Sequence, residues 1–133
     1  MKLFQQKSVI EKYDDVKSFV EAYNIGADDF ILATKRIYET CFAPLNLKAH
    51  VEYKSKYGSG EPTDVMIDAL LEDFRQGDYK RIIAIGGGAV IDMAKILVLD
   101  GEAKAESYYR KEVPLRKVRI LLAVPTTCGA GSE

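Results

Sequence analysis

The chain has 133 residues, of which 47% are hydrophobic and 29% are charged, which is typical of one soluble globular domain with its own core. Its 19 basic and 20 acidic residues leave a net charge of -1, so no global field would attract nucleic acid or an anionic membrane. No stretch reaches the ~18 apolar residues of a membrane helix and the N-terminus lacks the apolar core of a signal peptide, so we expect a cytoplasmic protein.

The first half of the chain predicts two helices and two strands. Residues 14–24 carry apolar side chains at helical spacing behind two acidic residues suited to an N-cap, and Gly26 is the expected stop. Phe30–Thr34 is a nearly continuous apolar run, the pattern of a strand buried on both faces. We expect a short helix at Arg36–Phe42 and a short strand at His50–Tyr53.

A clearer helix and strand lie in the middle of the chain. Thr63 is a candidate N-cap for a helix that ends before Gly77. Its apolar residues fall at i, i+3, i+4 and i+7: Ile67, Leu70, Leu71 and Phe74. Arg81–Ile85 is a β-branched apolar strand that three glycines, 86–88, bring to an end.

The last part of the chain completes the pattern. A helix follows the glycines, and the charge-rich residues 100–119 predict an exposed connection. Ile120–Val124 predicts one more buried strand, ended by Pro125. Apolar strands alternating with amphipathic helices favour an α/β fold, a Rossmann-like parallel sheet with helices on both faces, as one domain over residues 1–133.

The three glycines at the carboxyl end of a strand are the most informative local feature. Without side chains, a phosphate can approach the backbone, where free N–H groups and the positive end of the helix dipole face it. The alternative is a tight turn in which glycine only supplies a positive φ. Ile91 stands where both the Walker A pattern and G-x-G-x-x-G require glycine, so the turn matches neither fingerprint.

Other polar residues are weaker candidates. We place Asp92 in the first turn of the helix after the glycines, either stabilising the dipole or orienting the glycine turn. Thr126 and Thr127, after the last strand, could contact ribose or phosphate. His50, the single histidine, is expected to be a hydrogen-bonded structural residue. Cys128 receives no catalytic role, because no neighbour in sequence would lower its pKa.

Two segments together resemble one family. Residues 86–95 resemble the G-G-G-S-x-x-D-x-A-K segment of iron-containing (group III) alcohol dehydrogenases, and residues 125–133 resemble that family's P-T-T-x-G-T-G-S-E segment. The strand ending at Thr34 and the turn at residues 61–63 fall where the family has a nucleotide-binding strand and an N-P-T turn. Within the family, residues 57–62 and 81–85 are most similar to 4-hydroxybutyrate dehydrogenases.

The resemblance implies a function. Gly87, Gly88 and Ala89 would hold the cofactor pyrophosphate through their amides, and Thr126 and Thr127 would line the nucleotide site. Family members add a C-terminal helical domain whose aspartate and three histidines bind a divalent metal, iron or zinc. With one histidine, this chain is expected to end near the boundary with that domain, to supply no metal ligand and, as written, to bind cofactor weakly without oxidising an alcohol.

One departure from the family bears on the cofactor. Many members have an aspartate near Thr34 that bonds the adenosine ribose, whereas this chain has Thr34 followed by Lys35 and Arg36. Without a carboxylate to repel a 2′-phosphate, the cofactor is NAD or NADP, with NAD favoured because the members most similar to this chain use it.

The partners follow from the same resemblance, and two other classes remain as alternatives. Besides the dinucleotide, the complete enzyme would bind a small alcohol or aldehyde, and the sequence allows a homo-oligomer. A stand-alone dinucleotide-binding module without catalysis is the first alternative. A flavodoxin-like or response-regulator-like domain is disfavoured, because neither glycine-bearing segment is typical of those families.

Overall fold

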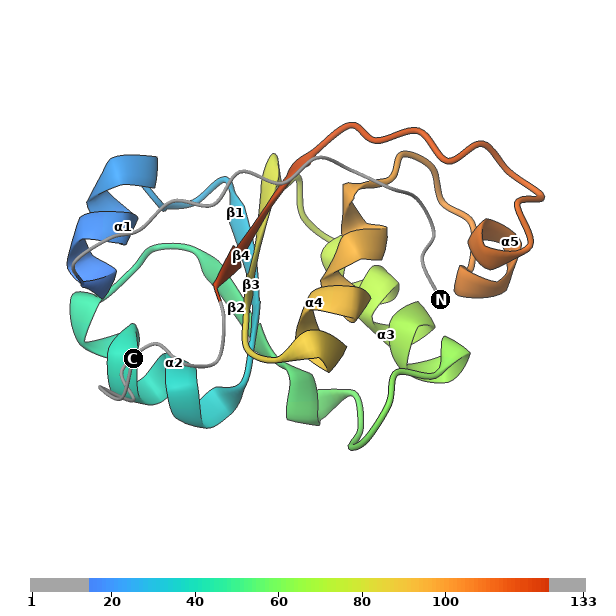
Figure 1. Cartoon of the computed structure of the whole chain (residues 1–133). Coiled ribbons are helices and arrows are strands. Elements are labelled where there is room, and N and C mark those ends of the chain that lie inside the picture. The colour runs from blue at the N-terminus through green and yellow to red at the C-terminus, as the bar shows by residue number, and fades with distance from the viewer. Residues whose placement is uncertain (1–14, 125–133) are drawn as a thin grey trace.

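The computed structural model describes residues 15–124, which form a four-stranded parallel sheet with helices on both faces (Figure 1). The strands are β1 (Asp29–Ala33), β2 (His50–Tyr53), β3 (Arg81–Ile85) and β4 (Ile120–Val124), in the order β2-β1-β3-β4. The helices are α1 (Val16–Tyr23), α2 (Lys35–Cys41), α3 (Asp64–Phe74), α4 (Gly88–Lys95) and α5 (Ala105–Tyr109). The predicted α/β fold with a parallel sheet is confirmed.

The sheet separates two hydrophobic cores, because successive side chains of a strand point to opposite faces. In Figure 1, α1 and α2 lie on one side of the strands and α3 and α4 on the other. On the first face, Ile31 and Ile83 pack with Tyr38 and Phe42. On the second face, alternate residues of β1 and β3 pack against α3 and α4: Phe30, Leu32, Ile82 and Ala84. All five residues of β1 are buried, as the apolar run predicts.

Side-chain caps begin two of the helices as predicted. Asp15 accepts a bond from the Ser18 N–H at 2.8 Å at the start of α1, and Thr63 accepts one from the Met66 N–H at 3.2 Å at the start of α3. The predicted helix over residues 14–24 is confirmed to within two residues at each end, but the predicted stop at Gly26 is wrong. Asn24, in the left-handed region with φ 52, caps the helix instead.

The junction between β1 and α2 also differs from the prediction. The strand ends at Ala33, and Thr34 is the N-cap of α2, which runs over Lys35–Cys41. The Thr34 N–H still donates to the Ile85 carbonyl at 2.8 Å, so the sheet bonding extends one residue beyond the last strand residue. The chain turns into the helix from that point.

The last third of the described chain corrects two expectations. Residues 100–119 are not merely an exposed connection, because they contain α5, whose Ala105 and Tyr108 are buried against α3. Asp68 of α3 accepts a bond from the Ala105 N–H at 2.7 Å. In the described part of the chain β4 is an edge strand that pairs only with β3, so it is partly exposed instead of buried, with Ile120 64% exposed. Among residues 15–124 no helix is long and apolar enough to cross a bilayer.

Candidate functional site

The strand order places a topological switch point at the carboxyl ends of β1 and β3. The connection after β1 runs through α2 on one face, whereas the connection after β3 runs through α4 on the other. Adjacent parallel strands whose connections leave in opposite directions form a topological switch point, and ligands of open α/β sheets bind there. The glycine turn at residues 86–88 and Thr34 lie on the two sides of this switch point.

The strand register aligns these two segments. Ala33 pairs with Ile85 across β1 and β3 and with Tyr53 across β1 and β2. The residues that follow this row, Thr34 and Gly86, therefore leave the sheet together. A Cβ atom placed on Gly86 would lie 2.5 Å from the Thr34 Oγ1 atom, which shows how closely the two turns approach.

The three glycines have different structural reasons to be glycine. Gly86 has φ +151, and a Cβ there would also lie 2.9 Å from the Val90 Cγ2 atom, so both conformation and space require glycine. Gly87 is the N-cap of α4 in an ordinary extended conformation, with φ -84 and ψ -168. The positive φ that the turn needs therefore belongs to Gly86, and backbone conformation does not demand glycine at Gly87.

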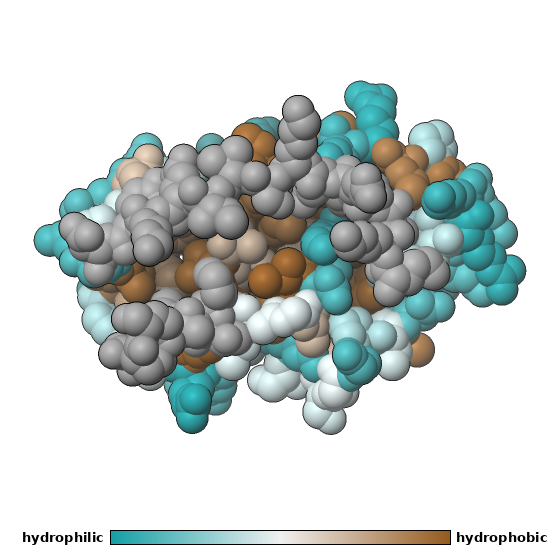
Figure 2. All heavy atoms as spheres, viewed as in Figure 1, coloured by the Kyte–Doolittle hydropathy of each residue, from teal (hydrophilic) through white to brown (hydrophobic). Residues whose placement is uncertain are grey.

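Gly88, the first residue of α4, has open space where a side chain would stand, because a Cβ there would meet no atom of residues 15–124 within 4 Å. Within the described part of the chain, no side-chain hydrogen bond caps the N-terminus of α4. In the view of Figure 2, hydrophilic residues gather at the two ends of the molecule, and hydrophobic and neutral residues lie between them. An uncapped helix N-terminus beside empty space is the arrangement that accepts an anion such as a phosphate. The pyrophosphate of a dinucleotide therefore fits the residues present.

Basic residues follow Thr34 on the other side of the switch point. Lys35 and Arg36 are exposed in the first turn of α2, which contains no acidic residue. The Lys35 Nζ atom lies 6.0 Å from the centre of the Tyr53 ring, at the end of β2. The side chain of Lys35 thus extends along the carboxyl edge of the sheet.

Asp92 does not lie where we expected it. It is the fifth residue of α4, so it falls in the second turn, and the first turn of this helix contains no acidic residue. Its side chain is 64% exposed and pairs with Lys95 at 3.5 Å. The expected first-turn position is therefore wrong, because the helix begins at Gly88. Burial, and then the negative charges of Asp64 and Asp92, raise the pKa of the Tyr109 hydroxyl.

Three positions that the sequence analysis singled out lie outside the described residues. Thr126, Thr127 and Cys128 fall beyond residue 124, outside the described residues.

Two open depressions of the described surface lie elsewhere, one between α3 and the start of α5 and one at the amino ends of β1 and β3. We assign the site by topology, because neither depression adjoins the glycine turn. No group of three or more His, Cys, Asp or Glu side chains that could hold a metal occurs within residues 15–124.

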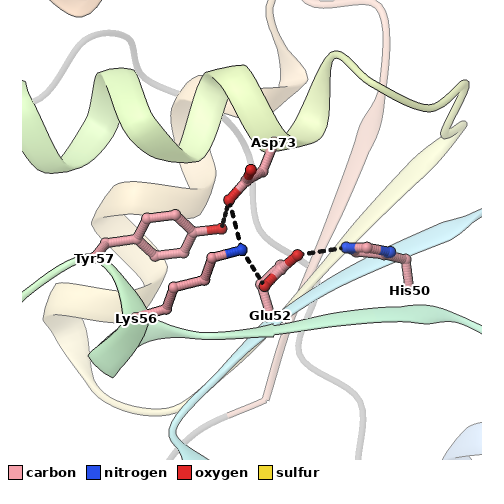
Figure 3. A network of polar contacts seen from close by, with 5 residues as sticks. All are labelled: His50, Glu52, Lys56, Tyr57 and Asp73. Carbon is pink, nitrogen blue, oxygen red and sulfur yellow. Dashed lines mark hydrogen bonds and ion pairs between the residues drawn. The ribbon is translucent and has the colours of Figure 1, made fainter.

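Sequence reasoning missed a polar network beside this edge (Figure 3). The Tyr57 hydroxyl donates to Asp73 at 2.7 Å, and the Lys56 Nζ atom lies 3.0 Å from the Asp73 carboxylate and 3.1 Å from that of Glu52. His50 joins the network through Glu52 at 2.7 Å and stacks on Phe30. The prediction that His50 is a hydrogen-bonded structural residue is thus confirmed. The other links join β2, the following turn and α3, and local sequence carries no signal for them.

The comparisons with known proteins agree with this geometry. The family model for iron-containing alcohol dehydrogenase matches residues 2–133. A 4-hydroxybutyrate dehydrogenase from Clostridium kluyveri is 41% identical over 133 residues, which is 100% of this chain and 36% of that protein. An alcohol dehydrogenase from Thermococcus barophilus is 35% identical over 82 residues, 55% of this chain and 22% of that protein.

A solved structure shows the same fold. The sulfoacetaldehyde reductase from Bifidobacterium kashiwanohense, in complex with NAD+, aligns with a TM-score of 0.61 over 83% of this chain and 31% of that one, at 19% identity. The chain thus spans about a third of the length of the reductase and of the Clostridium relative. Since the family model covers nearly the whole chain, this chain belongs to the iron-containing alcohol dehydrogenase family.

Proposed function

We propose that residues 1–133 form the dinucleotide-binding domain of a metal-dependent alcohol dehydrogenase. The observation that carries the proposal is the open space at Gly88 beside the uncapped N-terminus of α4, at a topological switch point. In this proposal the amides of Gly87, Gly88 and Ala89 bind the pyrophosphate, and Thr34 faces the adenosine ribose. Thr126 and Thr127 remain predicted contacts of the nucleotide.

The cofactor is NAD or NADP, and NAD is the first choice. The solved neighbour of the same fold is an NAD+ complex, and the relatives are dehydrogenases. When bound, the nicotinamide supplies a hydride acceptor or donor, and the divalent metal of the complete enzyme supplies a Lewis acid. This chain's own contribution is to bind the phosphates and to orient the dinucleotide along the carboxyl edge. We assign no metal ligand within residues 15–124.

The proposed reaction is hydride transfer between the nicotinamide and a small alcohol or aldehyde, with 4-hydroxybutyrate and succinate semialdehyde as the substrate pair. The 41% identity to a 4-hydroxybutyrate dehydrogenase over the whole chain supports this choice. Full-length protein that oxidised 4-hydroxybutyrate no faster than ethanol, as kcat/KM, would contradict the substrate assignment and leave the cofactor site standing.

Gly88→Val tests the cofactor site. The new side chain would fill the space that the phosphate needs, while the backbone there is helical and no described atom would clash with its Cβ. We expect Kd for NAD+ or NADP+, measured by calorimetry, to rise by about tenfold or more.

Gly26→Val is the matched control. A Cβ at Gly26 would likewise meet no atom of the described residues within 4 Å, but Gly26 precedes β1 at the opposite edge of the sheet. We expect parental affinity in this variant. Parental affinity in Gly88→Val, with both proteins folded, would refute the assignment of the glycine turn.

A further inference from the structure

A lysine holds the loop between β2 and α3 in shape. The Lys54 Nζ atom donates to the Gly58 carbonyl at 3.0 Å and to the Gly60 carbonyl at 2.7 Å. Both bonds are charge-assisted, and they close a loop whose residues 58–62 belong to no helix or strand. Gly58 and Gly60 have φ +143 and +78, so the loop relies on conformations that few other residues adopt.

The first part of this loop has a separate attachment. Tyr57 is fastened to α3 through Asp73, and Lys56 bridges Asp73 to Glu52 of β2 (Figure 3). Burial, and then the bond to Asp73, raise the pKa of Tyr57, so the hydroxyl stays protonated and remains a donor. The position of Tyr57 is therefore secured without Lys54, and the part that depends on Lys54 is residues 58–60.

This loop leaves the sheet beside the candidate cofactor site. Tyr53 pairs with Ala33, so Lys54 and Thr34 are the first residues beyond the same row of the sheet. The loop then runs to α3, which packs with α4 in the core on one face of the sheet. The loop that contains residues 58–60 therefore runs from the strand ends beside Thr34 to the face of the sheet that α3 and α4 cover. A Cβ at Gly60 would meet no described atom within 4 Å, so the described structure leaves the loop open at this point.

We propose that Lys54 is a positioning residue, which holds residues 58–60 as a preformed wall for the adenosine half of the dinucleotide. The inference rests on the proposed function, because it names a further part of the same site. Without Lys54, the loop would have to be ordered when the cofactor binds, and the conformational entropy lost there would weaken binding. Two of the three ammonium donors already bond the loop's own carbonyls, so Lys54 acts through the loop and not as a direct phosphate ligand.

Lys54→Met tests the inference in the full-length protein. It removes both bonds to the loop and keeps most of the aliphatic side chain. We expect Kd to rise about tenfold for NAD+ and by the same factor for ADP-ribose, because ADP-ribose contains the adenosine half. Lys54→Gln, which keeps a shorter donor, should fall between Lys54→Met and the parent, and it replaces Lys54→Met if that variant does not fold.

The control is Lys48→Met, which removes the same charge from an exposed residue before β2, at the opposite edge. Titrations at about 0.05 M and about 0.5 M salt separate a general charge effect, which salt screens, from loss of the loop's order, which it does not. A Lys54→Met effect that persists at high salt, with Lys48→Met equal to the parent, supports the proposal. Three outcomes would overturn the proposal. Lys54→Met could bind with parental affinity, its effect could disappear at high salt, or the effect could occur with NAD+ but not with ADP-ribose.

The same measurements distinguish this inference from the proposed function. If the parent protein binds none of NAD+, NADP+ and ADP-ribose, the proposed function fails and the role of Lys54 fails with it. If the parent binds a dinucleotide and ADP-ribose and Gly88→Val does not, while Lys54→Met binds as the parent does, only the role of Lys54 is refuted.

Discussion

Thr34 combines two features that set the chemistry of the proposed adenosine site. It is the N-cap of α2, yet its side chain makes no capping hydrogen bond, and its hydroxyl lies at the turn beside Gly86. The next two residues, Lys35 and Arg36, are exposed cations. A site with a hydroxyl and two cations does not repel a 2′-phosphate, whereas a carboxylate at Thr34 would.

We therefore expect Thr34→Asp to shift cofactor preference toward NAD in the full-length protein. The new carboxylate would accept bonds from the ribose hydroxyls and repel a 2′-phosphate, and for a site open to solvent we expect about a fivefold change. Lys35→Ala should move the preference the same way by removing a cation, and Thr34→Ser serves as the control that keeps a hydroxyl. The readout is the ratio of kcat/KM for NAD over NADP. An unchanged ratio in both Thr34→Asp and Lys35→Ala would show that this turn is not the adenosine site.

At the scale of elements, Asp73 joins α3 to the turn after β2. Burial by itself would raise the pKa of Asp73, but the hydrogen bonds from Tyr57 and Lys56 outweigh it, so the pKa lies below its ordinary value of 3.8. A carboxyl with a lower pKa in the folded state stabilises the fold fully above its ordinary pKa. That contribution is lost as the pH falls through the lower folded value.

Asp73→Asn tests this link between α3 and the turn. At pH 7 the variant loses the charge that attracts Lys56, and we expect a free energy of unfolding lower by about 1 kcal/mol. The difference from the parent should shrink below about pH 4, because the parent's carboxyl becomes protonated there as well. Urea unfolding at several pH values measures both quantities. A difference that stays constant down to about pH 2 would contradict the role of the Asp73 charge.

At the scale of the whole molecule, a buried ion pair ties three elements together at the amino edge of the sheet. Arg81 of β3 donates from Nε to Asp29 Oδ1 at 2.7 Å and from Nη2 to Oδ2 at 2.9 Å, and it also bonds the Tyr23 carbonyl at the end of α1. The Gly26 N–H donates to the same carboxylate at 2.8 Å. The Asp29 side chain is 3% exposed, so removing it leaves the Arg81 guanidinium without its buried counter-ion and the Gly26 N–H without its acceptor.

We expect Asp29→Ala to lower the free energy of unfolding by about 3 kcal/mol, since breaking a buried pair leaves an uncompensated charge. Asp78→Ala is the matched control, because the Asp78–Lys80 pair is exposed on both sides and such pairs contribute less than about 1 kcal/mol. Urea unfolding at neutral pH compares the two. Equal effects would mean that the Asp29–Arg81 pair does not link the elements energetically.

Much of the fold could be predicted from local sequence. The apolar run at β1, the β-branched run at β3 and the cap at Thr63 each reflect a rule that acts within a few residues. The glycine turn could be located for the same reason, because a strand, three glycines and a helix follow one another along the chain. The close approach of Gly86 to Thr34 could not be predicted, because Thr34 follows a different strand, 52 residues earlier in the chain. The turn of α4 in which Asp92 lies could not be predicted either, because it depends on the residue at which the helix begins.

What the sequence determined by itself is therefore the order and type of the main elements and the presence of a turn suited to a phosphate. The tertiary structure decided which segments meet. It places Thr34 beside Gly86, joins Asp29 to Arg81 across 52 residues and fastens Tyr57 to Asp73 across 16. Periodicity and backbone preference act over one or two turns of chain, whereas these contacts exist only after the parallel strands have paired and brought their ends to one edge.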